Sequence, residues 1–239
     1  MLCARLRPSS IGPAVGSRKE VERIVQQIRQ RWPEVEIILR GDSGFCSNEL
    51  MAWCEQQDRV AYVVGMARNQ RVEGLLAGPL AEAKQQFEAT QQPARIFIEF
   101  EHETLNGAWS KKRRVVAKAE YIDGKSNPRF IVTSLDSESW ERQKLYEELY
   151  CARGDMENRI KEQFVLFADR VSASTMRANQ LRIYLSVIAY TLMNGLRRLG
   201  LAATSMATAQ VGTIRLRLLK IGALIQVTVR KVWVRMASS

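Results

Sequence analysis

Histidine is nearly absent from this chain of 239 residues, where His102 is the single example. The four cysteines stand at positions 3, 46, 54 and 151, and no two of them form a Cys-x-x-Cys pair. Zinc sites are usually built from closely spaced cysteine and histidine ligands, so the sequence argues against one. Scattered cysteines also indicate reduced thiols, and we expect a cytoplasmic protein.

Long apolar runs are lacking as well. Arg5 and Arg7 interrupt any apolar segment near the N-terminus, so these residues do not resemble a signal peptide. The longest apolar run lies within residues 183–193 and is about half of the roughly 20 residues that span a bilayer. We therefore expect a buried helix there and no membrane association. Apolar residues make up 46% of the chain, which is enough for a packed core.

Acidic residues are missing from the last part of the chain. None follows Asp169, whereas residues 170–239 contain eleven arginines and lysines. The net charge of +11 therefore comes entirely from this segment, because the other 25 bases are balanced by 25 acids. Such an asymmetry favours a polyanionic partner, nucleic acid before a membrane. A basic face that serves only solubility would give the same pattern.

The spacing of apolar residues predicts alternating elements at the start of the chain. Residues 2–7, 35–39 and 60–67 are expected to form strands, and residues 17–32 and 47–57 are expected to form helices. Strands that alternate with helices in this way are typical of an α/β core.

The pattern changes after residue 70. Residues 72–89 have a helical period that is interrupted at Gly78-Pro79. Three strands that we expect to pair antiparallel then follow, at residues 94–105, 112–122 and 128–135. They form a β-rich insertion in the sheet or a continuation of it.

The rest of the chain is predicted to be mainly helical. Residues 141–168 read as one long helix or as a helix broken at Gly154, and residues 174–199 read as another helix. Residues 212–236 are expected to form a short amphipathic element followed by one strand.

One acid stands where a buried strand ends. In "ILRGDSGF", residues 37–44, three apolar residues lead through Arg40-Gly41 to Asp42. Asp, Ser and Gly are ordinary turn residues, and a turn explains the pattern. An active site explains it too, because α/β proteins place functional groups at the carboxyl ends of strands.

A second acid lies in "YCARGDMENRIK". Tyr150, Arg153, Glu157 and Lys161 are spaced by three, four and four residues, so on a regular α-helix they share one narrow stripe. An i,i+4 charge ladder on a solvated helix face has this spacing. The same residue types also suit a phosphate ester, with the acid binding a metal ion and the bases holding phosphate oxygens.

These stretches, with "LMAWCEQQ", "YVVGMARN", "MRANQLR" and "GTIRLRLLKIGA", closely resemble bacterial insertion-sequence transposases of the DDE class. The most specific element is Tyr-x2-Arg-x3-Glu, which Tyr150, Arg153 and Glu157 match. The resemblance implies a ribonuclease-H-like α/β fold, with a mixed sheet flanked by helices and a β-rich insertion before the glutamate helix. The wider group often has a lysine seven residues after the glutamate, where this chain has Phe164; Lys161, one turn after Glu157, is a substitute for it.

The resemblance assigns roles to the two acids. Asp42 corresponds to the second acid of an Asp-Asp-Glu triad and Glu157 to the third, both catalytic and both metal ligands. The implied cofactor is a pair of Mg²⁺ ions, with Mn²⁺ as an alternative, and the implied partner is DNA, both the ends of the insertion sequence and the target. The residues expected to contact DNA are Tyr150, Arg153, Lys161, Arg177, Arg182, Arg215, Arg217 and Lys220.

The first aspartate of the triad has no match. Before Asp42 the chain has only four acids, Glu20, Glu22, Glu34 and Glu36. The first strands of the fold are missing as well, with residues 2–7 expected to be its third strand. We therefore interpret the chain as the C-terminal part of a longer transposase. It divides into a partial core at 1–69, an insertion at 70–137, a helix carrying the third acid at 138–170, and a basic region at 171–239.

Two functional hypotheses remain open. The chain is a transposase that cleaves and joins DNA by metal-dependent phosphoryl transfer. Alternatively, it is a catalytically incomplete remnant that binds DNA, a second copy or the full-length transposase, and inhibits transposition.

Overall fold

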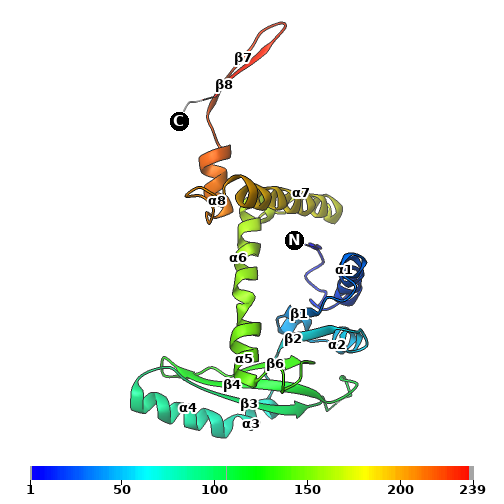
Figure 1. The fold of residues 1–239 in the computed structure, drawn as a ribbon, viewed down its shortest axis with the longest axis vertical. Helices are drawn as coiled ribbons and strands as arrows, with labels where there is room; N and C mark the ends of the chain where they lie inside the picture. The colour runs from blue at the N-terminus through cyan, green and yellow to red at the C-terminus, as the bar shows by residue number, and fades with distance from the viewer. Residues whose placement is uncertain (1, 106, 237–239) are drawn as a thin grey trace. The chain divides into compact units, whose positions relative to one another are not determined.

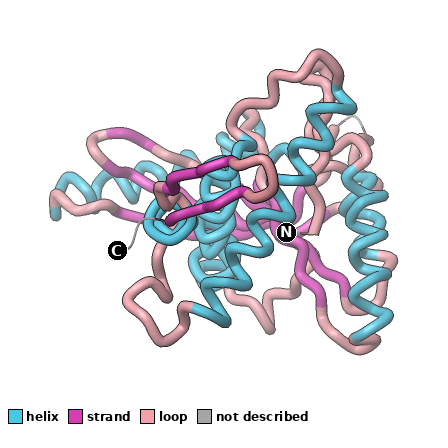
Figure 2. Tube along the Cα trace, turned by 90° about the horizontal axis from the view of Figure 1, so that it is seen from above, coloured by secondary structure: helices cyan, strands magenta, loops and turns pink. Residues whose placement is uncertain are grey.

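A computed structural model gives the fold of the chain (Figure 1). It describes residues 2–105 and 107–236, without the side chains of Arg153 and Asp155. The chain divides into two compact units, Ser9–Arg153, here called the sheet unit, and Met1–Pro8 with Gly154–Ser239, here called the helical unit. Each unit combines helices with strands (Figure 2).

The sheet unit is built on one mixed sheet. Its strands are β1 (Ile37–Gly41), β2 (Val60–Met66), β3 (Ala94–His102), β4 (Arg113–Ile122), β5 (Lys125–Ser126) and β6 (Arg129–Thr133). Their order is β1-β2-β6-β4-β3, with β5 paired to β4. β1 and β2 are parallel, and the other pairs are antiparallel. The predicted α/β class and the three antiparallel strands are therefore confirmed.

Helical segments surround this sheet. They are α1 (Ser17–Arg31), η1 (Ser43–Phe45), α2 (Asn48–Glu55), α3 (Gln70–Leu75), α4 (Ala77–Thr90), α5 (Arg142–Lys144), η2 (Leu145–Tyr150) and η3 (Cys151–Arg153). The Ser47 side chain accepts a hydrogen bond from the Leu50 amide and so begins α2 as its N-cap. α4 lies along β3 and β4 (Figure 1).

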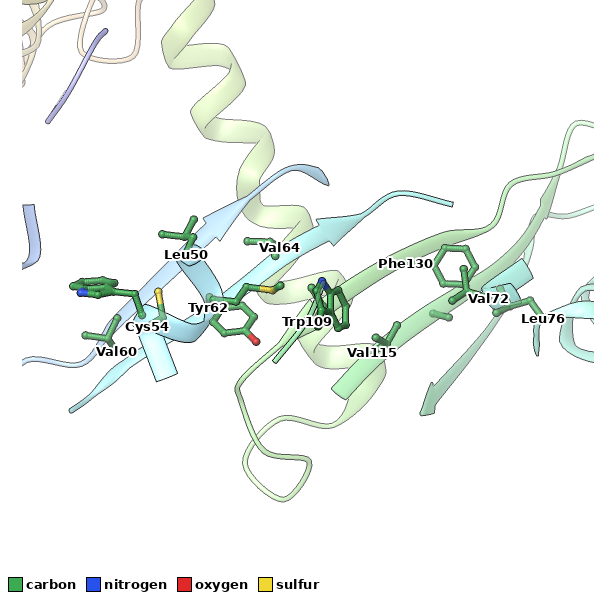
Figure 3. Packing of buried hydrophobic residues seen from close by; sticks show 14 of the residues in the cluster. Leu50, Cys54, Val60, Tyr62, Val64, Val72, Leu76, Trp109, Val115 and Phe130 are labelled. Carbon is green, nitrogen blue, oxygen red and sulfur yellow. The ribbon is translucent and has the colours of Figure 1, made fainter. Parts of the chain in front are cut away.

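Alternate residues of the central strands point to opposite faces of the sheet. On one face, Val64 and Val115 pack with residues of α2 and α3 in the cluster drawn in Figure 3. On the other face, Val63 and Val116 pack against Leu145 of η2. β2 is therefore buried on both sides, which explains why its sequence is almost continuously apolar.

The helical unit has a smaller core. Its elements are α6 (Gly154–Gln163), η4 (Phe164–Ala168), α7 (Met176–Gly195), η5 (Leu196–Gly200), α8 (Val211–Ile214), η6 (Arg215–Leu219), β7 (Ala223–Val227) and β8 (Val232–Met236). The buried side chains that join η4, α7 and α8 are Leu166, Tyr190, Met193, Val211 and Ile214. Within the described residues, no helix is both long enough and apolar enough to cross a membrane.

The prediction of a strand at residues 2–7 is wrong. This segment belongs to the helical unit and is held by Gln180 of α7. The Gln180 Nε2 donates to the Ala4 carbonyl at 2.9 Å, and its Oε1 accepts from the Leu6 amide at 2.6 Å. The segment's backbone thus bonds to a side chain and not to a neighbouring strand.

Three further boundaries differ from those predicted. The break after α3 falls at Leu76, and Pro79 lies in the first turn of α4, where a missing N–H costs little. Residues 142–168 are not one regular α-helix, because the π-helical segments η2 and η4 and the 3₁₀ turn η3 interrupt them. The C-terminal segment forms a hairpin of two strands, closed by a hydrogen bond from the Thr228 amide to the Lys231 carbonyl at 2.8 Å.

Candidate active site

Asp42 lies directly after the last residue of β1, as the sequence predicts. Its side chain is exposed, and Oδ1 accepts a hydrogen bond from the Gly44 amide at 2.9 Å. Asp42 therefore serves the turn by capping η1. It also stands at the carboxyl end of a strand that runs parallel to its neighbour, the usual place for a functional group in such a sheet.

Gly65 on the neighbouring strand lets three segments meet beside Asp42. A Cβ atom at Gly65 would lie 2.7 Å from the Tyr150 hydroxyl oxygen and 2.9 Å from the Ser43 amide nitrogen. Both distances are shorter than van der Waals contact, so a residue without a side chain is required for this approach. The sequence signal for Gly65 was a glycine inside an apolar strand, which often marks a close backbone approach.

A cavity of about 510 Å³ opens where these segments meet, and we call it the Asp42 cavity. Both Asp42, which the resemblance implies is catalytic, and Tyr150, which it implies contacts DNA, line it. The described residues that line it are Asp42, Ser43, Gly65, Met66, Ala67, Arg68, Pro128, Arg129, Phe130, Tyr146 and Tyr150.

Packing behind the cavity holds η2 in place. The rings of Tyr146 and Tyr150 have centroids 5.5 Å apart, and Tyr146 packs on Phe97 at the same distance. Burial raises the pKa of the Tyr146 hydroxyl, which therefore stays neutral. The Arg40 Nη1 donates to the Leu149 carbonyl at 2.7 Å and so ties β1 to η2.

The remaining residues of the transposase signature lie beyond η2. Glu157 and Lys161 are exposed on α6, in the helical unit. Arg153 ends η3, and its side chain lies outside the described part of the structure. The expected stripe assumed a regular α-helix from Tyr150 onward, and that assumption is wrong because η3 separates η2 from α6. Asp42 and Glu157 belong to different units, so the expected closeness of their carboxylates stays a prediction.

Glu162, also on α6, was not identified from the sequence. Its carboxylate accepts hydrogen bonds from the Arg197 guanidinium and the Val211 amide, each at 3.1 Å, and from the Tyr190 hydroxyl at 3.3 Å. Burial opposes ionisation, but the bonds from Val211 and Arg197 outweigh it, and the pKa of Glu162 is lowered. Glu162 thus fastens the helix that carries Glu157 to α7 and to the start of α8.

The basic residues predicted to contact DNA differ in their surroundings. Arg177 and Arg182 on α7, like Arg217 and Lys220, are exposed to solvent. Arg215 is already engaged within the unit: its guanidinium lies 4.5 Å from the Phe167 ring centroid and donates to the Val165 carbonyl at 3.1 Å. Only its remaining N–H groups are left to donate hydrogen bonds to a phosphate.

The donor atoms at Asp42 suit a hard cation in kind but are few in number. A carboxylate oxygen is the ligand that Mg²⁺ prefers. Among the residues that the structure describes, however, no group of three or more His, Cys, Asp or Glu side chains could hold a metal ion. Asp42 is the one acid among the described residues that line the cavity.

The whole sequence, residues 1–239, matches the model of the family described as transposase DDE domain group 1. The chain belongs to this family. The match confirms the resemblance seen in the sequence, and the mixed sheet flanked by helices is the arrangement of its ribonuclease-H-like fold. Membership supports a function in transposition. No curated protein matches the chain.

Proposed function

We propose that the chain acts in DNA transposition and that Asp42 and Glu157 are its metal-binding acids. The observation that supports this most directly is the Asp42 cavity. Asp42 and Tyr150 come from two separate stretches of the sequence that resemble DDE transposases, and both line this cavity at the carboxyl end of β1. A family match by itself carries no such information about individual residues.

The proposed cofactor is Mg²⁺, with Mn²⁺ as an alternative. A bound divalent ion supplies Lewis acidity for phosphodiester cleavage and strand transfer. The chain's own residues would bind and orient the substrate. Asp42 and Glu157 present carboxylate oxygens, Tyr150 presents a hydroxyl at the cavity wall, and Lys161 presents a positive charge for a phosphate.

We further propose that these 239 residues do not cleave DNA by themselves. Two divalent ions about 4 Å apart bring four positive charges, which two carboxylates do not balance. The chain would then bind DNA, with a second copy or a full-length transposase as a further partner.

The test measures DNA binding and strand cleavage in the same samples. A labelled DNA duplex is titrated with the chain in Mg²⁺, in Mn²⁺ and in EDTA, and the products are separated under denaturing conditions. We expect metal to strengthen binding by the wild type but not by Asp42→Ala, with no cleavage by either. Binding that ignores metal would contradict the role of Asp42. Metal-dependent nicking that Asp42→Ala abolishes would contradict the proposed incompleteness.

A further inference from the structure

We propose that Arg68 and Arg129 form a phosphate-binding pair at the Asp42 cavity, where they hold backbone phosphates of the DNA strand next to Asp42. The inference rests on the proposed function, which supplies the substrate class. It gives a role to two residues that the resemblance left without one: Arg68, near the end of the stretch "YVVGMARN", and Arg129, which lies outside the quoted stretches.

The sheet brings the two arginines to the same edge as Asp42. Arg68 follows the end of β2, and Arg129 begins β6. These strands are antiparallel neighbours in which Met66 is paired with Phe130, so the end of one lies beside the start of the other. Both arginines line the Asp42 cavity.

Both guanidinium groups are available to a ligand. Their residues are exposed, and within the described side chains no carboxylate forms an ion pair with either of them. Other arginines of the same unit are engaged differently: Arg113 contacts Glu55 at 2.7 Å, and Arg114 contacts Glu99 at 2.5 Å. A guanidinium without a carboxylate keeps its fork of N–H donors for a phosphate.

The charge of the cavity favours an anion. The described residues of its lining carry two guanidinium groups and one carboxylate, that of Asp42, so their net charge is positive. A divalent ion at Asp42 would be repelled by both arginines until a phosphate neutralises them. The same phosphate would supply oxygen ligands to the ion, so DNA and metal should bind cooperatively here.

The experiment compares the salt dependence of DNA binding for charge-matched variants. Fluorescence anisotropy of a fluorescein-labelled DNA duplex is measured with the wild type, with Arg68→Gln/Arg129→Gln and with Arg31→Gln/Lys112→Gln. The control pair removes the same two charges from exposed residues of the same unit that do not line the cavity. Each lost phosphate contact should reduce the slope of log affinity against log salt by about 0.9, so the cavity variant should be shallower by about 1.8.

The result is decided by this difference in slope. The control should keep the wild-type slope, and Arg68→Lys/Arg129→Lys should restore most of it because the charges return. If the double glutamine variant fails to fold, Arg68→Gln in its exposed loop should give about half of the effect. Equal slopes for the cavity and control variants, or a wild type that does not bind DNA, would overturn the inference.

This outcome is separate from that of the proposed function. A shallower slope in a chain whose DNA binding ignores metal would keep the arginine pair and remove the role of Asp42. If metal strengthens DNA binding only when Asp42 is present, and the salt slope is the same for the cavity and control variants, the role of Asp42 is kept and the arginine pair is removed.

Discussion

Replacing Gly65 by alanine should destabilise the sheet unit, although alanine normally favours the folded state more than glycine does. The new Cβ atom would meet the Tyr150 hydroxyl at 2.7 Å, the Ser43 amide at 2.9 Å and the Asp42 carbonyl carbon at 3.3 Å. Two of these neighbours are backbone atoms, which cannot swing away. Overpacking of this kind costs about 1–3 kcal/mol, and the smaller entropy of the unfolded alanine chain returns about 0.5–1 kcal/mol. Because contacts under 3.0 Å place the cost in the upper part of its range, we expect a net loss of about 1–2.5 kcal/mol.

Urea unfolding followed by circular dichroism measures this loss, and Gly74→Ala is its matched control. Gly74 lies in α3, and a Cβ there would meet nothing within 4 Å. Gly74→Ala should therefore stabilise the protein by up to about 1 kcal/mol, as expected inside a helix. In Tyr150→Phe the hydroxyl is gone, so part of the cost of Gly65→Ala should disappear in the double variant. A Gly65→Ala protein that is as stable as the wild type would refute the close approach.

Three other predictions follow from the ion pairs and the charge distribution. Arg113→Met should destabilise the protein by about 1.5–3 kcal/mol in urea unfolding, because the nearly buried Glu55 would lose its guanidinium partner and keep only Lys111 and Tyr62; no loss would contradict the pairing. Glu162 has a lowered pKa, so its stabilisation is present above the unfolded pKa of about 4.3 and is lost as pH falls through the folded value. Glu162→Gln should therefore lower stability at pH 7 by about 1.5–3 kcal/mol and flatten the decline of stability below about pH 4.3, and an unchanged pH profile would count against the Glu162 contacts. If about five C-terminal bases touch phosphates, they should contribute about −4 to −5 to the salt slope of DNA binding, in addition to the contribution of Arg68 and Arg129, and the size of the slope should fall by about 0.9 for each neutralised base. The bases to neutralise are Arg177, Arg182, Arg217 and Lys220.

Helices and strands whose boundaries are marked by neighbouring residues were predicted correctly from the sequence. The apolar period of α1, the serine cap of α2 and the continuous apolar run of β2 all correspond to observed elements. The position of Asp42 directly after β1 was predicted in the same way, because the end of the apolar run and the turn residues that follow it mark the end of the strand.

Features that depend on distant partners were missed. No sequence pattern in residues 2–7 indicates that their backbone forms hydrogen bonds with the side chain of Gln180, which lies more than 170 residues away in the sequence. The π-helical turns of η2 and η4 shift the helical register in a way that a fixed period cannot anticipate. The C-terminal hairpin was reduced to one strand because the turn at Thr228 has no glycine or proline to mark it.

The candidate site shows the same division. The signature residues were found because their spacing is fixed within short motifs. Arg68 and Arg129 gain their place only from the pairing of β2 with β6, and Gly65 only from the approach of Tyr150. Glu162 depends on partners on other helices, so its role needed the structure.

The central claim is that Asp42 and Glu157 hold one divalent ion together, and Mn²⁺ binding tests it most directly. Electron paramagnetic resonance can count free Mn²⁺ in the presence of a DNA duplex for the wild type, Asp42→Asn, Glu157→Gln and the double variant. A shared ion predicts that each single change weakens Mn²⁺ binding at least tenfold and that the second change adds much less than the first, a coupling of about 1 kcal/mol or more. Losses that simply add, or Mn²⁺ binding that neither change affects, would contradict the claim.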